Sequence, residues 1–207
     1  GLGDVYKRQP KGLAARLKAE GERTEADLVL TVDISRIKEL ADTGLLAPLA
    51  SDLVNKNVPS YLRDANDRWT ALSLRARIIA VSKERVGKQA ITTIEDLASP
   101  KWQGRVCSRK GSHVYNRAVL ASLIAHNGEE AAKNWTLGLV DNLARRPQGN
   151  DRAQAKAIYS GQCDVALMNT YYYGKMKFAK DKPEQQKWAD AIEIAFFNQD
   201  GRGQHVN

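Results

Sequence analysis

The sequence lacks three short motifs that mark common catalytic and nucleotide-binding sites. None of its 207 residues forms a G-x-S-x-G turn, a Walker A loop or a G-x-G-x-x-G loop. No nucleophilic side chain stands in a pattern with a base that would activate it. These absences argue against the commonest hydrolases and nucleotide-binding enzymes, and we expect a protein that is not an enzyme.

Histidine and cysteine are scarce. The three histidines, His113, His126 and His205, are too far apart for a zinc pattern. The two cysteines, Cys107 and Cys163, do not have CxxC spacing, and both lie on predicted neighbouring strands of one sheet. Two states are therefore open for them: a disulfide, which an oxidising compartment would permit, or a pair of buried thiols.

Long apolar runs and blocks of like charge are also missing. No run approaches the roughly 18 apolar residues that span a membrane. The net charge is +8, but the basic residues are scattered among acidic ones and form no basic–aromatic ladder. This pattern is typical of a solvated surface, so we expect no nucleic-acid partner.

The two ends of the sequence look unlike the rest. The stretch Gly1–Gln9 has neither a helical nor a strand period, and residue 1 is not methionine. We interpret it as a non-native scar and leave it out of the fold prediction. At the other end the chain stops in a polar loop. We therefore expect a fragment that lacks both ends, in which no export signal is visible.

Helical and strand-like segments alternate along the rest of the chain, which is typical of an α/β fold. A nearly continuous apolar run predicts a buried strand over 26–32, and Asp33 is expected to cap a helix over 35–42. A second unit of the same kind follows Val86. It includes a helix predicted over 113–126 and capped by Ser112, with an inner stripe of Val114, Ala118, Ala121 and Ala125.

We expect two lobes joined by two strands, an arrangement that forms a hinge and a cleft suited to closing over a ligand. The predicted parts are a partial first lobe over 10–77, a crossover strand over 78–86, a second lobe over 87–190 and a return strand over 191–207.

The longest strand-like segment, 69–82, carries two arginines. Arg75 and Arg77 would share one face, because strand side chains repeat every two residues. On a central strand two guanidiniums require an anionic group opposite them, whereas on an edge strand they would be solvated. Both arrangements are open.

Three consecutive tyrosines follow a short apolar run that predicts a buried strand. Tyr171 and Tyr172 are expected to begin a helix after that strand, and Tyr115 begins its own helix in the same way. The carboxyl ends of strands in an α/β sheet gather at one edge, so these hydroxyls should lie together. Tyr173 should point away and pack. Packing on a sheet edge would also explain the whole cluster.

Phenolates beside a guanidinium suit a ferric ion. Fe³⁺ is small, hard and highly charged, and its charge can ionise phenols whose free pKa is about 10. Three phenolates balance the charge of the ion, and an arginine can hold a small anion such as carbonate that completes the coordination. The tyrosines and the arginine pair are therefore candidates for one site.

Five short motifs occur in order along the chain: Arg75–Arg77, Gly111–Asn116, Pro147–Asp151, Asn169–Tyr172 and Asn198–Asn207. Through them the sequence from Lys11 onward resembles the ferric-iron substrate-binding proteins of bacterial ABC transporters. This is the ferric-binding-protein/FutA-like family of the periplasmic binding protein type II fold.

The resemblance implies a two-lobed α/β fold of the Venus-flytrap kind, each lobe a mostly parallel sheet flanked by helices. It implies that Tyr115, Tyr171 and Tyr172 are iron ligands and that Arg75 or Arg77 takes part in anion binding. It also implies further ligands in a segment before residue 1, so that the first lobe is incomplete here.

From this resemblance we expect a monomeric carrier in the periplasm, or otherwise lipid-anchored outside the cytoplasm. It would bind ferric iron in the cleft between the lobes, with carbonate as synergistic anion, and deliver it to an inner-membrane ABC permease. One alternative is a carrier of another small anion or organic ligand, in which the tyrosines only hydrogen-bond. A transferase or regulatory domain is another, because fold does not fix function.

Overall fold

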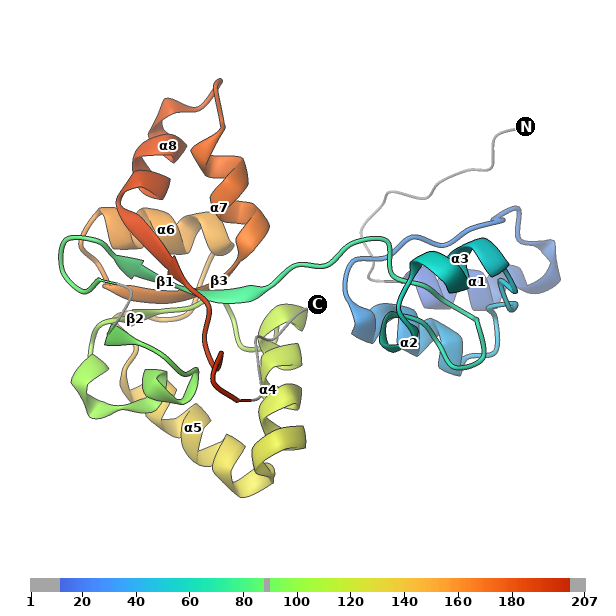
Figure 1. Ribbon diagram of the computed structural model, residues 1–207, viewed down its shortest axis with the longest axis horizontal. Helices are drawn as coiled ribbons and strands as arrows, with labels where there is room; N and C mark the ends of the chain where they lie inside the picture. The colour runs from blue at the N-terminus through green and yellow to red at the C-terminus, as the bar shows by residue number, and fades with distance from the viewer. Residues whose placement is uncertain (1–11, 88–89, 202–207) are drawn as a thin grey trace. The chain divides into compact units, whose positions relative to one another are not determined.

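The computed structural model describes residues 12–87 and 90–201. The chain divides into two units, Gly1–Leu74 and Arg75–Asn207, which we describe separately as unit 1 and unit 2 (Figure 1). The terminal stretch Gly1–Gln9, residue His205 and the end of the last motif lie outside the described residues. Among those described, no helix combines the length and the apolar character needed to cross a membrane.

Unit 1 is built from short helices. They are α1 (Leu13–Glu20), η1 (Gly21–Arg23), α2 (Ile34–Asp42), α3 (Asp52–Asn57) and η2 (Ser60–Leu62). The predicted cap of α2 is confirmed, because the Asp33 carboxylate accepts a hydrogen bond of 3.1 Å from the Ser35 N–H. Gly21 ends α1 with a positive φ of 52°, which glycine adopts without strain.

The strand predicted over 26–32 does not form, so this prediction was wrong. The segment is irregular, and Leu28 and Leu30 are 72% and 56% exposed. A strand needs a neighbour to pair its backbone N–H and C=O groups. Within the described part of unit 1 the strand-like pairing is a single bridge between Arg63 and Thr70. The apolar pattern was present, but no segment among the described residues pairs with it as a strand.

Unit 2 contains a four-stranded sheet in the order β2-β3-β1-β4. The strands are β1 (Arg77–Ser82), β2 (Val106–Cys107), β3 (Val165–Asn169) and β4 (Ile192–Ala195). Strand β1 pairs antiparallel with both β3 and β4, and β2 pairs parallel with β3. The α/β class is confirmed. The sheet is mixed rather than mostly parallel, because β1 inserts between β3 and β4 against their common direction.

The strand predicted over 69–82 is shorter than expected. Hydrogen-bonded ladders with β3 and β4 cover only 77–82. Before that point Leu72 and Leu74 are 78% and 51% exposed, and no strand in the described ranges 12–87 and 90–201 pairs with them. Arg75 therefore lies outside the strand and does not share a strand face with Arg77.

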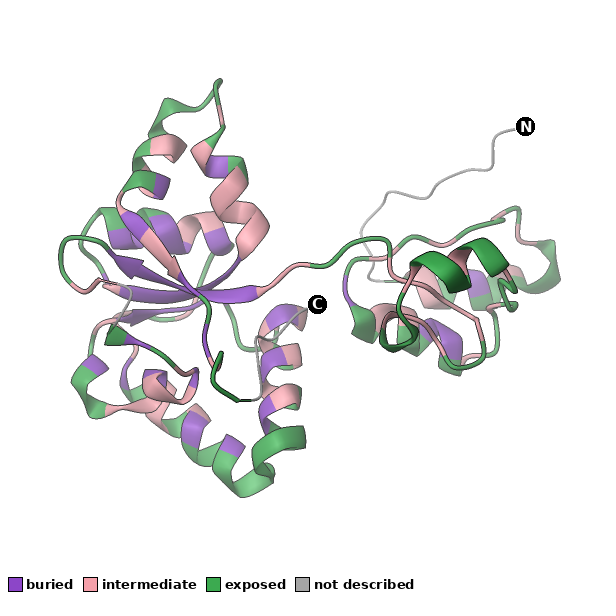
Figure 2. Ribbon diagram, in the orientation of Figure 1, coloured by how far each residue is buried: buried purple, intermediate pink, exposed green. Residues whose placement is uncertain are grey.

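Helices cover both faces of the sheet (Figure 1). On one face lie α4 (Val114–Asn127) and α5 (Glu129–Asp141); on the other lie α6 (Asp151–Tyr159), α7 (Thr170–Lys177) and α8 (Pro183–Asp190). Successive residues of β1 face opposite sides, so Ile79 and Val81 join the first core and Ile78 and Ala80 the second. Figure 2 shows the strands as the most continuously buried part of this unit.

Helix α4 begins and packs differently from the prediction. Its cap is His113 rather than Ser112, because the imidazole Nδ1 accepts a hydrogen bond of 3.2 Å from the Tyr115 N–H. Its buried residues are Tyr115, Val119 and Leu123, not the predicted stripe of small residues. The larger side chains remove more apolar surface from water, so they set which side of the helix faces the core.

Candidate functional site

The tyrosine corner lies where β3 ends and α7 begins. Asn169 is the last residue of β3, and Tyr171 and Tyr172 fall in the first turn of α7, as the sequence predicted. Their rings lie 4.3 Å apart between centroids. Tyr173 is partly buried and packs against the core on the α6–α8 face of the sheet. The corner thus presents two neighbouring phenols from one helix start.

Tyr115 meets this corner from a different helix. It lies in the first turn of α4, only 6% exposed, and its hydroxyl is 3.3 Å from the hydroxyl of Tyr171. The parallel strands β2 and β3 end at the same edge of the sheet, which brings the chain after both strands to one place. Two phenols separated by 56 residues are therefore within hydrogen-bond distance.

The environment of Tyr171 opposes ionisation of its phenol. Burial raises its pKa, because a buried phenolate would lose its hydration, and hydrogen bonds with the hydroxyls of Tyr115 and Tyr172 favour the neutral phenol and raise the pKa further. In the absence of a metal this phenol is protonated at neutral pH. A cation that binds this oxygen as phenolate therefore has to displace the proton.

Guanidinium groups surround the Tyr115 ring. The guanidinium carbons of Arg75, Arg77 and Arg109 lie 5.5, 5.7 and 5.1 Å from its centroid. Arg75 is also 6.0 Å from the centroid of the Tyr171 ring. The phenols therefore lie in a positive environment, which favours anions and anionic oxygen.

Two further cations flank the other tyrosines. The guanidinium carbon of Arg152 lies 5.0 Å from the centroid of the Tyr172 ring, and Lys175 Nζ lies 5.4 Å from the centroid of the Tyr171 ring. A hydrogen bond of 3.1 Å from Arg152 Nε to Gln185 fixes its side chain to α8. Sequence reasoning missed these two residues and Arg109. A weak signal existed for two of them, since Arg152 follows the Pro147–Asp151 motif and Lys175 is one helical turn after Tyr171.

The two arginines proposed for anion binding have different surroundings. Arg77 is fully buried, and its guanidinium donates to Asp151 at 2.7 Å and to Asn116 at 2.8 Å. Burial lowers the pKa of Arg77, and the adjacent Asp151 carboxylate counteracts that effect. Arg75 is half-buried and lies over the rings of Tyr115 and Tyr171.

Cys107 and Cys163 are joined by a disulfide in the structure, with their Cα atoms 5.9 Å apart. Both are buried in the core on the α6–α8 face. Cys107 ends β2, two residues before Arg109, and Cys163 lies just before β3. The bond therefore ties together the two strands that lead to the tyrosines.

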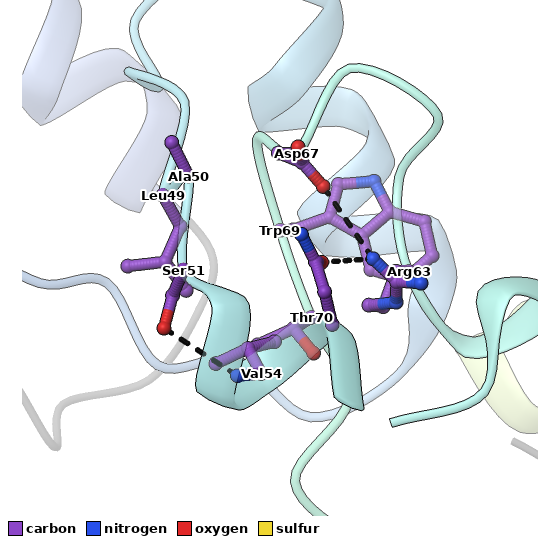
Figure 3. A pocket seen from close by; sticks show the side chains of 9 residues that line it. Leu49, Ala50, Ser51, Val54, Arg63, Asp67, Trp69 and Thr70 are labelled. Carbon is purple, nitrogen blue, oxygen red and sulfur yellow. Dashed lines mark hydrogen bonds and ion pairs between the residues drawn. The ribbon is translucent and has the colours of Figure 1, made fainter. Parts of the chain in front are cut away.

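Elsewhere in the described residues, neither a cluster of metal ligands nor a small hollow in unit 1 competes with the tyrosine site. No group of three or more His, Cys, Asp or Glu side chains there could hold a metal ion. The hollow in unit 1, shown in Figure 3 beside Trp69, Arg63 and Asp67, has a volume of about 10 Å³. That volume accommodates one water molecule at most. The tyrosines remain the candidate metal ligands.

Comparison with known proteins places this geometry in a family context. Residues 24–200 match the family described as bacterial extracellular solute-binding protein. Iron uptake protein A1 of Synechocystis sp. is 43% identical over 195 residues, which cover 94% of this chain and 54% of that protein. The major ferric iron-binding protein of Neisseria meningitidis serogroup A is 30% identical over 178 residues, covering 84% of this chain and 51% of that protein.

Solved structures show the same likeness. A Trichodesmium protein in complex with iron and citrate ligands superposes with a TM-score of 0.92 at 40% identity, over 97% of this chain and 63% of that one. Apo ferric ion-binding protein A of Pasteurella haemolytica gives 0.88 at 46% identity, over 95% and 61%. These likenesses confirm the expected periplasmic binding protein type II fold. The chain spans about half the length of the curated relatives it matches.

Proposed function

Because the chain belongs to the bacterial extracellular solute-binding proteins, we propose that it is a non-enzymatic carrier of ferric iron. Its ligands are the phenolates of Tyr115, Tyr171 and Tyr172. The observation that carries this proposal is the distance of 3.3 Å between the hydroxyls of Tyr115 and Tyr171. These two tyrosines lie in the first turns of two separate helices, and the ring of Tyr172 lies beside that of Tyr171. One ion can bridge oxygens held this close.

Ferric iron fits these oxygens better than a softer or less charged ion. Burial raises the pKa of Tyr171, so that a bound cation has to supply the free energy that removes its proton. A trivalent ion does this most effectively, and three phenolates neutralise its charge. The relatives support the choice, because they are named for iron uptake and for ferric iron binding.

Arg75 is the better candidate for holding a synergistic anion such as carbonate. It is half-buried and lies over two of the phenol rings. The guanidinium of Arg77 is fully buried and donates to protein groups. An anion that completes the coordination of the metal would therefore reach Arg75 more readily, with a charge-assisted hydrogen bond as its attachment.

Delivery of the ion to an inner-membrane ABC permease, outside the cytoplasm, completes the proposal. It is supported by the family description and by the iron-uptake names of the relatives. Closure of two lobes over the ion, the domain limits and a monomeric state stay predictions.

The test is a titration of the purified full-length protein with ferric iron, followed by visible absorption. Phenolate ligation produces a phenolate-to-iron charge-transfer band. We expect the band in the wild-type protein and its loss when Tyr171→Phe and Tyr172→Phe are combined. Tyr173→Phe is the matched control, since it removes a hydroxyl from the same helix and should keep the band.

A colourless protein would refute the iron proposal. Calorimetry with phosphate and with a sugar acid would then test the alternative, a carrier of a small anion in which the phenols only hydrogen-bond. The cluster of Arg75, Arg109, Arg152 and Lys175 around the tyrosines favours that alternative over any uncharged ligand.

A further inference from the structure

A buried carboxylate lies behind the tyrosine site and joins the elements that carry it. Asp151 is the first residue of α6 and is fully buried. Its Oδ2 accepts hydrogen bonds from Arg77 Nη1 and from the backbone N–H of Asn169, both at 2.7 Å, and its Oδ1 accepts one from Arg109 at 2.9 Å. Three donors from three parts of the chain thus meet on one side chain.

Each of these links leads to a tyrosine. Asn169 is two residues before Tyr171, so the bond to its N–H holds the start of α7. Arg77 donates from its other nitrogen to Asn116, the residue after Tyr115, at 2.8 Å. The chain Asn169–Asp151–Arg77–Asn116, which we call the buried clamp, therefore connects the first turns of α7 and α4.

The position of the buried clamp suits it to fix the distance between the Tyr115 and Tyr171 hydroxyls, in addition to stabilising the fold. The hydroxyls of Tyr115 and Tyr171 come from helices on opposite faces of the sheet. Within the described residues, a buried polar connection between those two helix starts runs through Asp151 and Arg77, and a longer hydrogen bond of 3.4 Å also joins Arg77 Nη1 directly to Asn169 Oδ1. A carboxylate that accepts both a backbone N–H and a guanidinium defines their relative position more narrowly than apolar contact does.

We propose that Asp151 is a positioning residue of the tyrosine site, acting through Arg77 to hold the Tyr115 and Tyr171 hydroxyls at the spacing one ferric ion needs. This inference rests on the proposed function. It concerns the geometry of the ligands and not their identity, because Asp151 itself is behind the phenols and does not contact the ion.

Asp164 offers a matched control. Its carboxylate also accepts from two arginines, Arg105 at 2.6 Å and Arg85, and its side chain is 14% exposed. It lies just before β3, at the opposite end of that strand from the tyrosine corner. Removing its charge should also weaken the fold, though by less, because its partners Arg85 and Arg105 are 34% and 39% exposed, and it should leave the spacing of the phenols undisturbed.

The experiment compares Asp151→Asn and Asp164→Asn in the full-length protein loaded with ferric iron. Two quantities are measured on the folded fraction: the wavelength of the phenolate-to-iron band and the rate at which a chelator removes the iron. We expect Asp151→Asn to shift the band and to release iron at least tenfold faster. Asp164→Asn should lower the melting temperature but keep the wild-type band and a release rate within twofold.

A milder variant covers the case in which Asp151→Asn does not fold. Asn116→Ala removes the acceptor of Arg77 Nη2 without leaving a buried charge unpaired, although it also removes the hydrogen bonds that Asn116 Nδ2 donates to Ser108 Oγ and to the Arg109 carbonyl. We expect the same shift and faster release. The inference would be overturned, and the proposed function left standing, if folded Asp151→Asn kept the wild-type band wavelength and release rate. If Asp151→Asn is unfolded, the same result for Asn116→Ala would overturn it. Absence of the band from the wild-type protein would overturn the proposed function and this inference with it.

Discussion

Replacing Arg77 by alanine should destabilise the fold, whereas replacing Arg75 should affect only the retention of iron with its anion. Arg77 is fully buried and paired with Asp151. Removing one partner of a buried ion pair costs about 3–5 kcal/mol. We expect about 3 kcal/mol, the lower end, because Arg109 would still neutralise part of the Asp151 charge.

The expected cost for Arg75→Ala is much smaller. Arg75 lies outside β1 and is half-buried, and we expect its replacement to change the free energy of unfolding by at most about 0.5 kcal/mol. If Arg75 holds the synergistic anion, its loss should speed the release of iron when carbonate is present and change little when it is absent. Of the two arginine variants, only Arg75→Ala should therefore show an effect that depends on carbonate.

The assay combines urea unfolding followed by circular dichroism with chelator-driven release of iron, measured with and without carbonate. The reasoning would be refuted if Arg77→Ala lost less than about 1 kcal/mol, which is below the range for a buried pair. It would also fail if Arg75→Ala sped release equally with and without the anion.

Three further predictions concern the disulfide, a helix cap and pH. Replacing Cys107 and Cys163 by alanine removes a cross-link between residues 56 positions apart, which frees the unfolded chain and should lower the free energy of unfolding in urea by about 4 kcal/mol. A decrease of less than about 1 kcal/mol would contradict this entropic reasoning. Asn150→Ala removes the side-chain acceptor for the Ala153 N–H at the start of α6 and should lower the free energy of unfolding by about 1 kcal/mol in the same urea experiment. An unchanged urea midpoint would show that this cap does not contribute to stability. Since burial raises the pKa of Tyr171, protons compete strongly for its oxygen, so the iron band should fade as the pH falls and return on neutralisation; a band that persists into the range where carboxylates protonate would argue against phenolate ligation.

Helix ends and the strand-to-helix corner were predictable because their signals are local. Asp33 caps α2 through a bond to a residue two positions away, and the apolar run before Tyr171 forms β3 followed directly by α7. Such features depend on a few neighbouring side chains and on backbone geometry, both of which a sequence displays.

The failures share a different cause. The apolar segment 26–32 and the first half of 69–82 read as strands, but a strand forms only where another chain segment pairs with it. The inner face of α4 was likewise misassigned, because Val119 and Leu123 face a core made of residues far away in the sequence. Pairing and packing partners are not visible in a local pattern.

The candidate site shows the same division. The sequence by itself determined which tyrosines begin helices after strands, that two arginines stand near them, and which family the motifs resemble. Only the tertiary structure decided that Arg77 is buried against Asp151 while Arg75 lies over the phenol rings. The reason is physical: the role of a charged side chain depends on its burial and on its partners, and Asp151, the partner that neutralises Arg77, lies 74 positions away along the chain.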